Sequence, residues 1–77
     1  MTDRSAIQEH MEVIGADGGH IGTVDHVEGE RIKLTRNDPG AAGKHHYLPL
    51  SMVEDVDGGK ARMSFKAELV TQFWEEA

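Results

Sequence analysis

Five histidines are the residues of this chain with the widest chemical range, because imidazole binds metal ions, transfers protons and titrates near neutral pH. They are His10, His20, His26, His45 and His46. His26 and His46 could be neighbours across adjacent strands, with Asp25 nearby, and would then suit zinc, copper or nickel. Against this, the adjacent His45 and His46 should point to opposite faces of a strand. We therefore expect mostly structural or surface histidines, and keep a metal- or small-ligand-binding site at His26, His45 and His46 as the alternative.

Asp25 and His26, together with Ser51 or Thr23, have the residue types of a hydrolytic triad. A triad needs its base within hydrogen-bonding distance of the nucleophile and oriented by a third group. Because neighbouring strand residues face opposite ways, Asp25 should not be able to orient His26. The sequence also contains no Gly-x-Ser-x-Gly nucleophile elbow. We therefore expect no catalytic residues and no enzymatic activity.

Two other segments resemble ligand-binding loops only superficially. The segment Gly15–Gly19 is rich in glycine, but a phosphate loop joins a strand to a helix, whereas this segment is expected to join two strands. Glu54–Asp57 is acidic, yet it lacks the regularly spaced oxygen ligands of a dedicated calcium loop. The sequence therefore predicts no bound cofactor.

The overall composition restricts the class of partner. The chain has 77 residues, a formal net charge of −6 and no cysteine. Acidic residues spread along the chain disfavour binding to phosphate backbones, and no run of apolar residues is long enough to cross a bilayer. No signal peptide is recognised at the start. We expect a single cytoplasmic domain over residues 1–77, with neither nucleic acid nor membrane as a partner.

Short apolar runs separated by glycine turns predict an antiparallel sheet. Strands are expected over residues 11–14, 21–27, 31–36, 45–50, 51–56 and 60–63. In the second of these, apolar residues at 21, 24 and 27 break strict alternation, and Gly22 indicates a bulge or sharp bend there. Bends of this kind allow a small sheet to curl into a barrel. The predicted fold is a strongly bent antiparallel β-barrel of five to six strands over residues 11–63.

Helical structure is expected at both ends. Ser5 and Gln8 have the spacing of a capping box, which predicts one helical turn as far as His10. Near the other end, Phe65, Leu69 and Phe73 repeat every four residues and predict a helix over about residues 65–75.

The apolar stripe of this C-terminal helix also contains the only tryptophan of the chain. The stripe is wide for so small a protein, and a small domain gains stability from association. It could cap one end of the barrel or pack against a second subunit. Leu69, Phe73 and Trp74 are therefore the candidate interface residues, and a homodimer or higher homo-oligomer is expected.

Three segments carry a family resemblance: residues 12–27, residues 32–35 and residues 45–51. The most specific elements are Asp-Gly-x-x-Ile-Gly-Thr-Val, which starts at Asp17, and His-His-Tyr-x-Pro-Leu, which starts at His45. In these elements the chain resembles the PRC-barrel superfamily, and most closely a small family of stand-alone bacterial proteins of uncharacterised function. The resemblance covers residues 5 to 74.

The resemblance implies a short β-barrel that acts as a protein-docking module, with no catalytic residues in common across the superfamily. Relatives of this kind form the cytoplasmic part of a photosynthetic reaction-centre subunit and part of a ribosome-maturation factor. Those relatives carry an anchor or further domains, so their partners are not transferred. The expectation is a non-enzymatic interaction or assembly module with an unidentified protein partner.

Overall fold

Glycine-containing turns divide the chain into short strands, most of them close to the predicted positions. The structure is a computed structural model and describes residues 7–36 and 43–76. Its strands are β1 (Glu12–Ile14), β2 (His20–Glu28), β3 (Arg31–Leu34), β4 (His46–Pro49), β5 (Val53–Asp57), β6 (Lys60–Met63) and β7 (Glu75–Glu76). Two short 3-10 helices, η3 (Leu50–Met52) and η4 (Ala67–Gln72), connect them.

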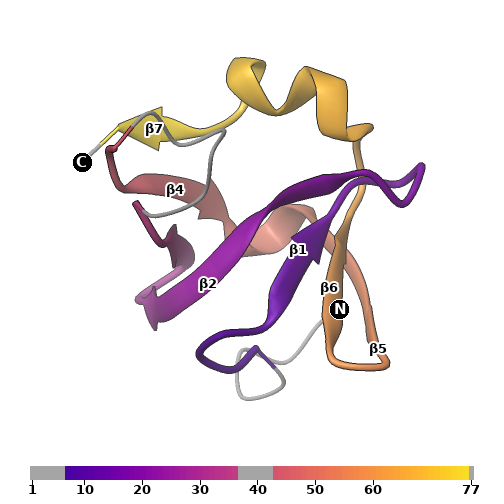
Figure 1. The fold of residues 1–77 in the computed structure, drawn as a ribbon, viewed down its shortest axis with the longest axis horizontal. Helices are drawn as coiled ribbons and strands as arrows, with labels where there is room; N and C mark the ends of the chain where they lie inside the picture. Colours follow the sequence, from indigo (N-terminus) through magenta and orange to yellow (C-terminus); the bar gives the residue numbers. More distant parts are fainter. Residues whose placement is uncertain (1–6, 37–42, 77) are drawn as a thin grey trace.

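The strands form a mixed sheet that is not closed into a barrel (Figure 1). Six strands follow the order β5-β6-β1-β2-β3-β4, and the two-residue β7 adds to the outer edge of β4. Most neighbours are antiparallel, but β1 runs parallel to β6. The predicted mainly β fold of five to six mostly antiparallel strands is confirmed, but its closure into a barrel is wrong, and the pairing of β1 with β6 makes the sheet mixed. The edge of β4 that would close a barrel onto β5 is occupied by β7 instead.

The irregular apolar spacing of β2 has the predicted cause. The pairing of β1 with β2 passes from Val13 opposite Gly22 to Ile14 opposite His20, so Ile21 is an extra residue on β2. This bulge allows both Ile21 and Val24 to be buried. A side chain at position 22 would press against Leu34. The predicted bulge near Gly22 is confirmed.

The core lies inside the bent sheet and is built from alternate strand residues. On β3, Ile32 and Leu34 are buried while Arg31 is exposed, as the period of two predicts. The largest fully buried side chains are Ile32, Leu34, Leu48, Met63, Val13 and Val24. Burial of several aliphatic side chains at about 1.5–3 kcal/mol each is the main stabilising contribution available to a chain without disulfides.

The C-terminal α-helix predicted over residues 65–75 does not form. The 3-10 helix η4 takes its place, followed by a turn and β7. The physical reason is the repeat: a 3-10 helix places residues three apart on one side, so Val70 and Phe73 face the core while Leu69 turns outward. A bond from the Phe73 amide to the Val70 carbonyl (2.9 Å) ends the helix.

The predicted N-terminal helical turn lies partly outside the described residues. Its described part, Ile7 to His10, forms a turn in which His10 has a positive φ of 68°. The His10 amide donates to the Val24 carbonyl (2.8 Å), so the segment is held against β2 and not by a helix of its own. Within residues 7–36 and 43–76, no helix is long and apolar enough to cross a membrane.

Candidate functional site

The three candidate interface residues lie close together in sequence but have different environments. Leu69 is 36% exposed and is the one large hydrophobic side chain classed as exposed among the described residues. Phe73 stacks on Phe65 with ring centroids 4.6 Å apart. Trp74 stacks on His46, with ring centroids 3.8 Å apart and an angle of 13° between the planes. Leu69 is therefore the most exposed of the three, while Phe73 and Trp74 are half-buried.

His46 belongs to the core and not to a surface site. It is 4% exposed, and among the described residues its Nδ1 finds no hydrogen-bond partner. The adjacent His45 is half-buried and points the other way, where its Nδ1–H donates to the carbonyl of Leu34 (3.0 Å). The structure thus separates His46 from the other two histidines of the predicted metal set.

Asp25 and His26 lie side by side, contrary to the expectation from strand alternation. The register of β2 against β3 shifts between Val24 and His26, so Asp25 is an extra residue at a second bulge. This brings Asp25 Oδ2 to 3.6 Å from His26 Nδ1 and 4.0 Å from His45 Nδ1. Regular alternation does not hold at this bulge, but 3.6 Å is too long for the hydrogen bond by which Asp25 would orient His26.

His26 contacts two carboxylates. Its Nε2–H donates to Glu28 Oε1 (2.9 Å), and its Nδ1 faces Asp25. The bond from His26, and a second bond from the side chain of Tyr47, hold the pKa of Glu28 below its ordinary value. Asp25, His26, Glu28 and His45 form a group that brings together two of the predicted site residues, and we name it the histidine–carboxylate cluster.

The side chains of the histidine–carboxylate cluster are not arranged as a preformed metal site. Within the part of the chain that the structure describes, no group of three or more His, Asp or Glu residues is placed to hold a metal ion. In the histidine–carboxylate cluster, the Nδ1 of His45 that approaches Asp25 is already used by the Leu34 carbonyl. Its lone pair is therefore unavailable as a ligand in this arrangement.

A further ion-pair group lies on the outer face of β1. His20 Nδ1–H donates to Glu12 Oε2 (3.0 Å), and Lys60 Nζ lies 3.6 Å from Glu12 Oε1. The bond from His20 is the main cause of the lowered pKa of Glu12, and Lys60 contributes in the same direction. These pairs are largely exposed, so we assign them a small effect on stability.

The Asp17 carboxylate has a positioning role that the sequence only partly indicated. The Asp-Gly-Gly motif predicted a turn, and indeed Asp17 Oδ1 accepts from the Gly19 amide (3.2 Å). The same oxygen accepts from the Ala67 amide at the start of η4 (3.2 Å), fifty residues away. No local sequence pattern predicts that contact. These backbone bonds, the one from Ala67 foremost, lower the pKa of Asp17.

The comparisons with known proteins give a family but no activity. Among curated proteins, and among solved structures, none matches the chain. A family model described as an uncharacterised protein conserved in bacteria matches residues 7–71, which is most of the chain. The chain therefore belongs to this bacterial family, DUF2171, whose function is uncharacterised.

Proposed function

We propose that this protein is a non-enzymatic interaction module of PRC-barrel type that associates with a second copy of itself, as a homodimer or a larger homo-oligomer. The observation that carries the proposal is the exposure of Leu69 on η4. An isolated exposed leucine is ordinary, but this one lies four and five residues before the half-buried Phe73 and Trp74. Covering the exposed parts of these three side chains would remove apolar area from water.

The non-enzymatic part of the proposal is supported by the partners of the histidines. His26 contacts the carboxylates of Glu28 and Asp25, and His45 contacts Asp25 and a backbone carbonyl. Neither carboxylates nor carbonyls are the alcohol or thiol nucleophiles that a histidine base activates in acyl transfer.

The proposal is tested with Leu69→Glu, because Trp74 also stabilises the monomer through its stack on His46. Thr71→Glu is the matched control: it adds the same charge at an exposed position of η4. Molar mass is measured by light scattering over a range of protein concentrations. We expect the wild type and Thr71→Glu to be oligomeric, and Leu69→Glu to be monomeric with an unchanged fold. A monomeric wild type, or an oligomeric Leu69→Glu variant, would contradict the proposal.

A second candidate function is binding of a first-row transition metal or another small ligand at His26 and His45. It is favoured by the convergence of both imidazoles on Asp25, while Glu28 holds the other nitrogen of His26 as carboxylates do in metal sites. The predicted set also includes His46. Its ring is stacked on Trp74 and would have to leave that stack before it could bind a metal ion. Because His45 must give up its bond to Leu34, binding is expected to be weak.

Calorimetric titration with zinc, copper and nickel tests this candidate. We expect the double variant His26→Gln, His45→Gln to lose the binding, because glutamine keeps the volume but not the ligand nitrogen. His20→Gln is the control, since His20 lies at the start of β2 and bonds to Glu12 instead of Asp25 or Glu28. Equal affinity in the wild type and the double variant would rule the site out.

A further inference from the structure

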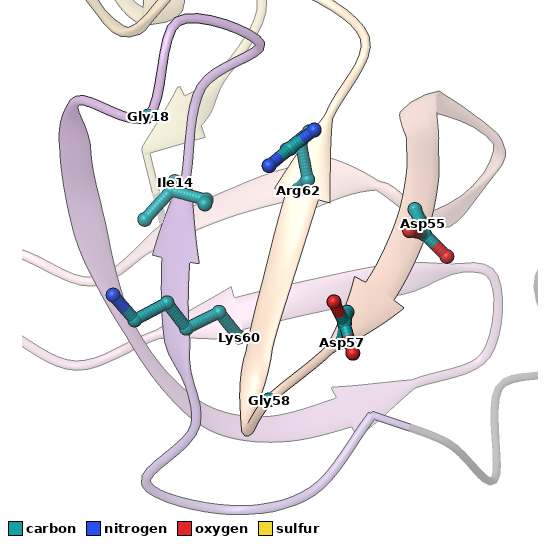
Figure 2. Close-up of a pocket in the computed structure, with 7 residues that line it drawn as sticks. All are labelled: Ile14, Gly18, Asp55, Asp57, Gly58, Lys60 and Arg62. Carbon is teal, nitrogen blue, oxygen red and sulfur yellow. The ribbon is translucent and has the colours of Figure 1, made fainter.

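The outer face of β1, β6 and β5 carries a cleft that no part of the proposed function uses. Its volume is about 370 Å³, and Figure 2 shows the residues that line it: Ile14, Gly18, Asp55, Asp57, Gly58, Lys60 and Arg62. The cleft lies on the side of the sheet opposite the core, because Ala61 and Met63 of β6 face inward. Its walls come from two segments that lie far apart in the sequence, residues 14–18 and residues 55–62.

The strand registers set the order of charges across the cleft. Arg62 lies opposite Asp55 on one side and beside Ile14 on the other. Two residues away on β6, and on the same face, Lys60 lies between Asp57 and Glu12. The cleft thus has an acidic wall on β5, a basic row on β6 and an apolar contact surface at Ile14.

Two charged side chains of the cleft, Asp57 and Arg62, are not used in ion pairs with other described residues. Lys60 extends toward β1, where its Nζ lies 3.6 Å from Glu12 Oε1, and so turns away from Asp57 (Figure 2). Within the described residues, the side chains of Asp57 and Arg62 form no ion pair and no hydrogen bond. The cleft therefore presents one free carboxylate and one free guanidinium, diagonally placed on adjacent strands.

We propose that this cleft binds a small zwitterion, an amino acid whose carboxylate is held by Arg62 and whose ammonium group is held by Asp57. Guanidinium groups match carboxylates in a two-bond fork, and ammonium groups donate to carboxylates. A ligand of a single charge is attracted by one wall and repelled by the other, whereas a zwitterion satisfies both. Its carbon chain lies against Ile14.

The spacing of the two groups selects among amino acids. Diagonal neighbours on antiparallel strands have Cα atoms about 7–8 Å apart, against about 5 Å for direct neighbours. A zwitterion with its two charged groups separated by several carbons fits a diagonal pair better than one with a single carbon between them. We therefore expect affinity to rise from glycine to β-alanine to 4-aminobutyrate.

Chemical-shift titration of backbone amides, with these three amino acids as probes, tests the proposal. For a site this open we expect dissociation constants on the order of millimolar, with saturable shifts at Gly58, Lys60 and Arg62. Butyrate and butylamine carry one charge each and should bind at least tenfold more weakly than 4-aminobutyrate. Equal binding of butyrate, or no saturable shift with any probe, overturns the proposal.

Two variants and their controls link the binding to the named side chains. Arg62→Gln and Asp57→Asn should each weaken 4-aminobutyrate binding by about tenfold or more, because each leaves one charged end of the ligand unpaired. Lys66→Gln and Glu54→Gln remove the same charges from exposed positions outside the cleft and should bind as the wild type does. Unaltered binding in Arg62→Gln would also overturn the assignment.

The test is independent of the proposed self-association. The Leu69→Glu variant should bind 4-aminobutyrate with wild-type affinity, since Leu69 does not line the cleft. Amide spectra of each variant report whether the fold is retained. Loss of association with intact ligand binding, or the reverse, therefore separates the two proposals.

Discussion

At the scale of single residues, glycine is required where the first hairpin turn packs against η4. The backbones of the two segments lie so close together there that a side chain does not fit between them. The Ala16 amide donates to the Phe65 carbonyl (2.8 Å), and Asp17 accepts from the Ala67 amide (3.2 Å). A Cβ atom at Gly15 would overlap the backbone nitrogen of Ala67. The close approach of the two segments, and not a special φ, is the reason for glycine at position 15.

Gly15→Ala should therefore destabilise the fold by about 2 kcal/mol or more, because the added methyl group forces the turn and η4 apart. Urea unfolding followed by the fluorescence of Trp74, the only tryptophan, measures the change. Gly43→Ala is the control: its φ is 77° but a Cβ there meets open space, so the cost should be about 1 kcal/mol. Equal losses in the two variants would show that crowding at Ala67 is unimportant.

At the scale of elements, the sequence predicted what depends on local pattern and missed what depends on distant contacts. The turns, most strand positions and the bulge beside Gly22 follow from glycine placement and alternation. The second bulge at Asp25 has no glycine to mark it, so the register shift that brings Asp25 toward both His26 and His45 was not predicted. The 3-10 geometry of η4 was missed because an apolar repeat alone does not distinguish it from an α-helix.

The link between Asp17 and η4 makes stability depend on pH. The pKa of Asp17 is lowered in the folded state from an ordinary value of 3.8. A carboxyl group of this kind stabilises the fold above its unfolded pKa, and the contribution is lost as the pH falls through the lower, folded value. Glu12 and Glu28, with lowered pKa values, act in the same direction. We expect the free energy of unfolding to decrease steadily below about pH 4.5.

The variant Asp17→Asn isolates the contribution of this residue to the acid sensitivity. Asparagine keeps an oxygen that can accept from Ala67 but does not titrate, so the decrease below pH 4 should be shallower than in the wild type. Glu54→Gln, at an exposed position of β5, serves as the control. Unfolding curves at a series of pH values measure the slopes. A slope as steep as that of the wild type in Asp17→Asn would contradict the assignment.

At the scale of the whole molecule, the open sheet leaves two edges that differ in their protection. The edge beside β4 is covered by β7, with Trp74 stacked on His46 at the start of that strand. The edge at β5 carries Glu54, Asp55 and Asp57 and a bulge between Val53 and Asp55. Charged side chains and bulges at an edge oppose strand-to-strand aggregation. Self-association at Leu69 is thus better supported than pairing through β5.

The net charge of −6 sets the salt dependence of that association. Two copies repel each other, while an apolar contact at Leu69 is insensitive to screening, so added salt should favour the oligomer. Sedimentation in about 20 mM and about 500 mM NaCl measures the fraction of oligomer, at a protein concentration where about half of the oligomer is dissociated. The Debye length falls several-fold between these two salt concentrations. A decrease in oligomer at high salt would indicate an interface of ion pairs instead.

The parallel pairing of β1 with β6 has a consequence for how the chain folds. β1 pairs locally with β2, but its other neighbour, β6, lies far later in the sequence. Contacts between residues far apart in sequence are formed late and slow the folding of small proteins, because the closure of a long loop precedes any gain from the contact. The β2–β3 hairpin can form early, whereas the centre of the sheet is completed only when β6 pairs with β1. Folding of this protein is therefore expected to be limited by a single long-range closure at β1.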